Sequence, residues 1–172
     1  MKKLLIGLLL VAATGYSQSS IQFSVLQDAN LAINGAYDTS TSGTLDMLFR
    51  LKLEGKQTKY GYLIVLPEVE YAKLLPVEYY RYSFGAGWQF TNFRWDAIST
   101  GLYVTYGFII RDNLSTSSWG LNGEVNLRVF KGVNLIALGQ LIERSDLGLY
   151  GLGGGTEIKF SGFLGLQIKL TK

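Results

Sequence analysis

The stretch YYRYSFGAGWQF, from Tyr79 to Phe90, alternates between two kinds of side chain. Every second position carries a large ring or, once, a small alanine: Tyr80, Tyr82, Phe84, Ala86, Trp88 and Phe90. The positions between them are small or polar: Arg81, Ser83, Gly85, Gly87 and Gln89. Because successive side chains of a strand point to opposite faces, this stretch predicts a strand with one aromatic and one small or polar face.

The same period of two recurs along most of the chain. It predicts eight strands near 21–33, 45–54, 60–72, 79–90, 97–110, 119–129, 133–144 and 157–170. Polar or glycine-containing connections separate them at 35–44, 55–59, 73–78, 92–96, 111–117, 131–132 and 145–155. Pro67 is awkward within its strand because it has no N–H to donate. The 133–144 segment is apolar on both faces, so its pattern gives no orientation.

The beginning of the chain has the layout of a secretory signal peptide. Lys2 and Lys3 precede an apolar run from Leu4 to Ala13, which is shorter than the roughly 20 residues that span a bilayer. We expect cleavage after Ser17, with Ala13 as the alternative, and therefore a signal peptide at 1–17 and one domain at 18–172. No later segment is long and apolar enough for a membrane helix, and the chain has no cysteine for disulfides or lipid attachment.

The charge balance argues against nucleic-acid binding. The net charge of +3 includes Lys2 and Lys3, so removal of the signal peptide leaves 14 basic and 13 acidic residues. A nucleic-acid surface needs an excess of clustered basic residues, which this balance does not provide.

The two faces of the strands can be assigned in two ways. In a soluble β-sandwich or lipocalin the apolar face is the core and the other face meets water. Here that other face is rich in Gly, Ser and Asn with charges of both signs, which favours the inverse: apolar side chains toward lipid and charges inside a closed barrel.

An eight-stranded barrel has an interior just wide enough for side chains. Glycines such as Gly101 and Gly120 would make room for long charged residues, whose burial requires partners. We predict an interior network of paired charges that comprises Arg50, Glu68, Glu70, Arg81, Glu124, Arg128 and Glu157. Rings near strand ends predict interfacial belts, as Tyr79, Tyr80, Phe90, Phe93 and Trp95 suggest. The predicted lipid-interface aromatics are Tyr80, Tyr82, Trp88, Phe90, Trp95 and Trp119.

With this pattern the chain resembles the small bacterial outer-membrane β-barrels represented by OmpX, OmpW and the OmpA transmembrane domain. The resemblance covers the mature chain and includes the alternating last strand from Gly162 to Leu170, although Thr171-Lys172 stands where family members commonly have an aromatic ending. It implies an all-β, up-and-down transmembrane barrel in the outer membrane. It also implies that the barrel-assembly machinery and the lipid bilayer are partners.

Catalytic chemistry has little support in the sequence. Barrel enzymes of the outer membrane resemble one another in using a catalytic histidine, and this chain contains no histidine. It also contains no cysteine, so both of the usual strong zinc ligands are missing. Glu68 and Glu70 form the one carboxylate pair to consider for glycoside hydrolysis, and ion pairing with Arg50 or Arg81 explains them better. The GLGGGT segment at 151–156 lacks the lysine of a P-loop and precedes a strand. We predict no catalytic residues, metal or cofactor.

The leading hypothesis is a non-enzymatic outer-membrane barrel with a plugged interior and a structural or envelope-integrity role. One alternative is a barrel that binds or passes one small apolar molecule, as the resemblance to OmpW implies, with Ile136, Leu138 and Ile142 facing inward. Another is a secreted, soluble, lipocalin-like binding protein.

Overall fold

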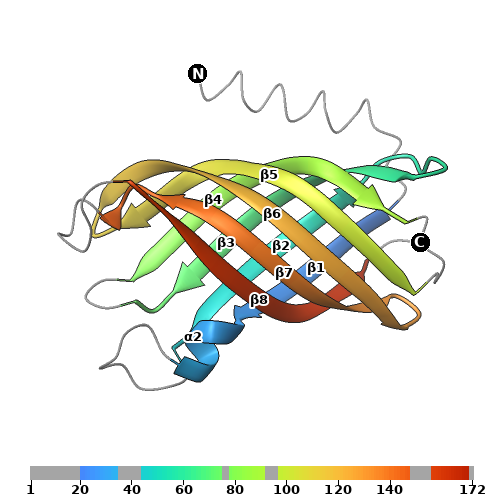
Figure 1. Ribbon diagram of the computed structural model, residues 1–172, viewed down its shortest axis with the longest axis horizontal. Coiled ribbons are helices and arrows are strands. Elements are labelled where there is room, and N and C mark those ends of the chain that lie inside the picture. The colour runs from blue at the N-terminus through green and yellow to red at the C-terminus, as the bar shows by residue number, and fades with distance from the viewer. Residues whose placement is uncertain (1–19, 35–43, 75–77, 92–96, 148–155, 171–172) are drawn as a thin grey trace.

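The computed structural model describes residues 20–34, 44–74, 78–91, 97–147 and 156–170. In these ranges eight antiparallel strands, paired in chain order, close into a barrel (Figure 1). The strands are β1 (Ser20–Asp28), β2 (Asp46–Glu54), β3 (Gly61–Ala72), β4 (Tyr79–Phe90), β5 (Ile98–Arg111), β6 (Leu114–Phe130), β7 (Val133–Arg144) and β8 (Glu157–Lys169). β8 pairs with β1, so the barrel is closed. The predicted eight-stranded up-and-down barrel is confirmed.

The barrel has two different ends. We call the end where β1 begins and β8 finishes the terminal end; it carries the short β2–β3 and β6–β7 connections and lies at the right of Figure 1. The opposite end, called the loop end, carries the β1–β2, β3–β4, β5–β6 and β7–β8 connections. The predicted signal peptide, Phe93, Trp95 and the predicted turn at 92–96 lie outside the described residues. Among those described, no helix is long and apolar enough to cross a membrane.

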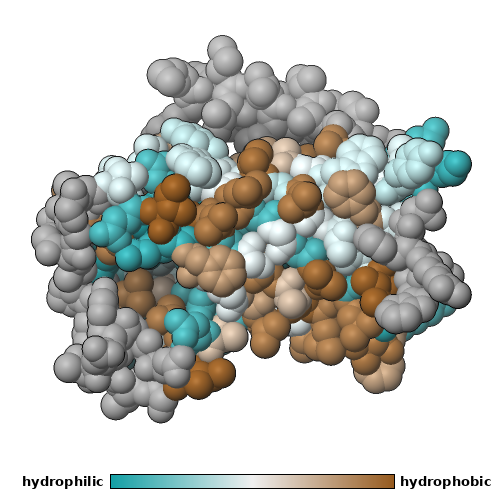
Figure 2. Space-filling view, viewed as in Figure 1, coloured by the Kyte–Doolittle hydropathy of each residue, from teal (hydrophilic) through white to brown (hydrophobic). Residues whose placement is uncertain are grey.

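Apolar side chains cover the outside of the barrel. On β5, Leu102, Val104 and Tyr106 are each more than half exposed, and Phe160 on β8 is 72% exposed. Figure 2 shows apolar side chains over the strands of the visible face, with many of the hydrophilic ones toward the two ends. Because the inward positions carry buried charges instead, the lipocalin-like alternative is wrong and the sheet is that of a transmembrane barrel.

The interior is not only ionic. β7 turns Ile136 and Leu138 inward, which settles the orientation that its sequence leaves open. They belong to a buried apolar cluster contributed by six strands: Leu26, Leu48, Ile64, Leu66, Tyr103, Ile136, Leu138 and Phe163. This cluster fills part of the lumen beside the predicted charge network, and its Ile136 and Leu138 face inward as the small-ligand alternative requires.

The first strand is shorter than predicted. β1 ends at Asp28, and α2 (Ala29–Asn34) follows where the alternation predicts strand as far as Ile33. The carboxylate Oδ1 of Asp28 accepts a hydrogen bond of 2.8 Å from the Leu31 N–H, as an N-terminal helix cap does. Local capping thus overrides the period of two.

The connection between β5 and β6 is also shorter than the predicted loop at 111–117. β5 extends to Arg111, β6 begins at Leu114, and only Asp112 and Asn113 join them. Both have positive φ, 46° and 64°, as the central residues of a type I′ hairpin turn require. The two longest strands of the barrel therefore form one extended hairpin.

Pro67 interrupts the β2–β3 ladder locally. The register is the same on both sides, with Arg50 opposite Glu68 and Leu53 opposite Val65, but the two positions between them are not paired across these strands. On the other side of β3, Pro67 lies opposite Phe84 of β4 in an unbroken register. The missing N–H is thus accommodated without a change of register.

Candidate functional site in the barrel interior

Glu124 of β6 links opposite walls of the barrel. Its carboxylate accepts hydrogen bonds from Arg50 Nη1 and Lys52 Nζ, both on β2, which is four strands away around the barrel. It also accepts one from Asn126 Nδ2 at 2.9 Å. Arg50 Nη1 further donates to the hydroxyl of Tyr103 on β5 at 2.7 Å. The charges therefore cross the lumen and occupy its middle.

The two carboxylates of β3 lie next to this group. Glu68 Oε1 is 3.6 Å from Arg50 Nε, and Ser83 Oγ donates to Glu68 Oε2 at 3.3 Å. Glu70 Oε2 is 4.0 Å from Arg81 Nη1. Both carboxylates are about 95% buried or more and lie against guanidinium groups. This geometry fits ion pairing and not the acid/base pair of a glycosidase, which must reach a sugar substrate.

A further ionic cluster lies at the loop end. Asp146, just after β7, binds Arg144 through both carboxylate oxygens at 2.7 and 2.8 Å. It also pairs with Arg111 Nη1 at 3.2 Å. Although burial raises the pKa of the Asp146 carboxyl, these hydrogen bonds and charges outweigh it and hold that pKa below its usual range.

Tyr79 belongs to this cluster and not to the predicted aromatic belt. Its side chain is 1% exposed and points inward, with the Arg144 guanidinium carbon 4.5 Å from its ring centroid. Tyr79 is two residues before Arg81 in β4, so the two side chains lie on the same, inward face of the strand. The alternation therefore contains the signal for its inward position.

Two glycines create the space for these long side chains. A Cβ at Gly101 would lie 2.9 Å from Glu124 Cγ, and a Cβ at Gly120 would lie 2.8 Å from Thr105 Oγ1 and 3.3 Å from Arg81 Nη2. The inward glycines therefore allow bulky charged groups to fill a narrow barrel.

The predicted network and the observed one overlap without coinciding. Arg50, Glu68, Glu70, Arg81 and Glu124 are buried in the lumen. Arg128 is exposed near the terminal end, and Glu157 at the loop end pairs with Lys159 at 2.6 Å on a partly exposed surface. These two are corrections: each lies at an end of its strand, where the barrel opens to solvent.

Lys52 and Asp146 are central residues that the prediction omits. Lys52 shares the inward face of β2 with Arg50, so the alternation contains the signal for it. Asp146 lies beyond β7, where no periodic pattern marks it.

Five of the six predicted lipid-interface aromatics lie in described strands, and all five face outward. Tyr82, Phe90 and Trp119 are between 38% and 48% exposed, whereas Tyr80 and Trp88 are half-buried against neighbours. Tyr80 and Tyr71 have ring centroids 5.0 Å apart, and both hydroxyls donate to the Glu78 carboxylate at the loop end. Trp95 lies outside the described residues.

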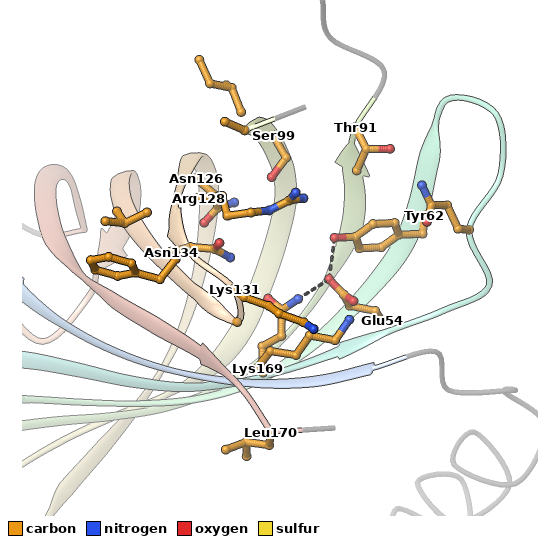
Figure 3. A pocket seen from close by; sticks show the side chains of 17 residues that line it. Glu54, Tyr62, Thr91, Ser99, Asn126, Arg128, Lys131, Asn134, Lys169 and Leu170 are labelled. Atoms are coloured by element: carbon orange, nitrogen blue, oxygen red, sulfur yellow. Dashed lines mark hydrogen bonds between the residues drawn. The ribbon is translucent and has the colours of Figure 1, made fainter. Parts of the chain in front are cut away.

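A pocket of about 1250 Å³ opens at the terminal end, beyond the ionic centre (Figure 3). β1, β2, β3, β5, β6, β7 and β8 and the β6–β7 turn contribute residues to it, including Glu54, Tyr62, Arg128 and Lys169. Within the part of the chain that the structure describes, no group of three or more acidic, histidine or cysteine residues is arranged to hold a metal ion.

Solved structures share the architecture, among them the following three. The chain is similar to the outer-membrane protein Ail of Yersinia pestis, studied in a phospholipid bilayer nanodisc, with a TM-score of 0.55, 10% identity and coverage of 88% of this chain and 99% of that one. Neisserial surface protein A gives a TM-score of 0.50 and 12% identity over 87% and 94% of the two chains. A de novo designed transmembrane β-barrel gives a TM-score of 0.50 and 12% identity, with coverage of 90% of this chain and 98% of that one.

No family model and no curated protein matches the chain by sequence. At 10–12% identity the solved structures establish the fold alone, which is that of the small transmembrane β-barrels of the outer membrane. The outer-membrane localisation expected from the sequence agrees with this fold.

Proposed function

We propose that the chain is a non-enzymatic outer-membrane β-barrel with a plugged interior and a structural role in the envelope. The observation that carries the proposal is the ionic bridge from β2 to β6 through Glu124, which spans the lumen. The apolar cluster from six strands adds a second filled layer. Side chains that fix opposite walls to one another stabilise a barrel and leave no continuous aqueous path.

The orientation follows from the even number of strands. The terminal end would face the periplasm, since the chain would arrive there after secretion and be inserted by the barrel-assembly machinery. The loop end would face outward, and the bilayer would contact the apolar belt. The Tyr71–Tyr80 pair with Glu78 would then lie at the outer interface, where aromatic rings with polar tips are favoured.

The alternative of a small apolar ligand is less favoured. Ile136 and Leu138 do face inward, as that hypothesis requires, but they pack against Leu26, Leu48 and Phe163. A ligand would have to displace these side chains. Leu138→Arg would abolish uptake of an apolar molecule and leave insertion intact if such a site existed.

Planar-bilayer recording tests the plugged interior. We expect the purified barrel to give no steady conductance steps. A triple variant with Arg50→Ala, Tyr103→Ala and Glu124→Ala should give steps, because it removes the groups that cross the lumen. Leu102→Ala, on the outer face, is the matched control and should stay silent. Steady conductance of the unmodified chain would overturn the proposal.

A further inference from the structure

Among the described residues that line the terminal-end pocket, positive charges outnumber negative ones. Three cationic side chains line it: Arg128 of β6, Lys131 of the β6–β7 turn and Lys169 of β8. Within the described residues none of the three makes a salt bridge. In the lumen and at the loop end, by contrast, arginines and Lys52 are paired with carboxylates.

Glu54 is the one carboxylate among the described residues of the pocket lining, and its oxygens already have neutral donors. Gln22 Nε2 and the Tyr62 hydroxyl each donate to Oε1 at 2.5 Å, and Ser20 Oγ donates to Oε2. Figure 3 shows the bond from Tyr62 to Glu54 on one side of the pocket, and Lys131 and Lys169 extend toward that side. Within the described lining, the three cations therefore exceed the single Glu54 carboxylate.

The floor of the pocket is closed. Asn126, on the pocket wall, donates to Glu124, and Lys52 donates to Gln89 Oε1 at 3.1 Å as well as to Glu124. A solute that enters from the terminal end therefore meets the ionic centre of the barrel. The pocket can hold a ligand and does not lead to a channel.

From this arrangement we infer that the terminal-end pocket binds a phosphate-bearing anion through Arg128, Lys131 and Lys169. A phosphate carries close to two negative charges and three acceptor oxygens, which suit one guanidinium fork and two ammonium groups. A pocket of about 1250 Å³ has room for a compound larger than a single phosphate. The inference depends on the barrel fold and is independent of the structural role proposed above.

Calorimetric titration with pyrophosphate tests the inference. The protein is refolded in an uncharged maltoside detergent and titrated at fixed ionic strength. We expect one site per chain, with binding weakened at least fivefold by Arg128→Gln and by Lys169→Gln. Lys59→Gln is the matched control, because Lys59 lies in the β2–β3 connection over the Tyr60 ring and outside the pocket lining. It should leave the affinity unchanged.

Two results would overturn the inference: absence of pyrophosphate binding, or an equal loss of affinity in Lys59→Gln, which would indicate general charge attraction. A gel shift on boiling, retained by each variant, shows that a loss of binding is not a loss of the barrel. Adding phosphatidylglycerol to the micelles identifies the source of the phosphate. Competition by the lipid would support the site with a lipid headgroup as ligand, and an unchanged affinity would support it with a soluble phosphate compound.

Discussion

Glu124 is an interior carboxylate that pairs with two cations across the lumen. It is buried and compensates two cations, Arg50 and Lys52, that come from the opposite wall. A buried ion pair adds little stability when compared with well-packed apolar groups of similar size. Removal of one partner, however, leaves a buried charge without compensation. The effect of a substitution here is therefore expected to be much larger than at an exposed pair.

Glu124→Gln should lower the free energy of unfolding by about 3–5 kcal/mol, because Arg50 and Lys52 lose their shared carboxylate. Urea unfolding of the refolded protein in micelles, followed by tryptophan fluorescence, measures this change. Glu157→Gln is the control: its pair with Lys159 is partly exposed, so a loss of about 1 kcal/mol or less is expected. Similar small losses in both variants would contradict a stabilising ionic centre.

Asp146 lies at the loop end, and its ionisation should make the stability of the barrel depend on pH. Its pKa is lower in the folded protein than the usual value of about 3.9, so its contribution is present above that value and is lost as the pH falls through the folded pKa. Urea midpoints of the native protein and Asp146→Asn should differ at pH 7 and converge below about pH 4. A difference that stayed constant down to pH 2 would argue against the paired carboxylate.

At the scale of elements, the alternation is informative wherever one face meets lipid and the other the lumen. It located all eight strands, but it misplaced the β5–β6 turn because Ser115 and Ser117 are exposed and polar beyond the apolar part of the hairpin. There the outward-facing positions carry serine instead of apolar side chains, so the alternation of apolar and polar residues is lost even though Thr116 is half-buried and Ser118 is buried. The alternation also extended the predicted first strand through α2. Leu31 and Ile33 keep the two-residue spacing of apolar side chains, but Asp28 caps a helix there.

The β5–β6 turn gives a prediction about one element. Asn113 has a φ of 64°, a conformation that glycine adopts freely and β-branched residues resist. Asn113→Gly should leave the urea midpoint unchanged or raise it slightly, and Asn113→Val should lower the free energy of unfolding by about 1–2 kcal/mol. Equal stability of the two variants would indicate a longer, relaxed loop of the kind that the sequence alone predicts.

For the whole molecule, the closed barrel with its apolar outer surface followed from composition and period. Apolar side chains toward lipid and polar or charged ones inside produce an alternation in most strands, although β7 is apolar on both faces. The composition of the interior was only partly predictable. Arg128 and Glu157 have the right alternation for the lumen but lie at strand ends. The apolar layer around Leu48, Ile64 and Phe163 depends on which inward positions meet across the barrel, and that is a property of strand register.

The most direct test of a closed, membrane-spanning barrel is the mobility of the protein from washed outer membranes in an SDS gel, with and without boiling. An intact barrel resists SDS because every strand is paired on both sides, so the unboiled protein should migrate differently from the boiled one. Identical mobility, together with recovery of the protein in the soluble fraction, would contradict the membrane barrel and everything proposed from it.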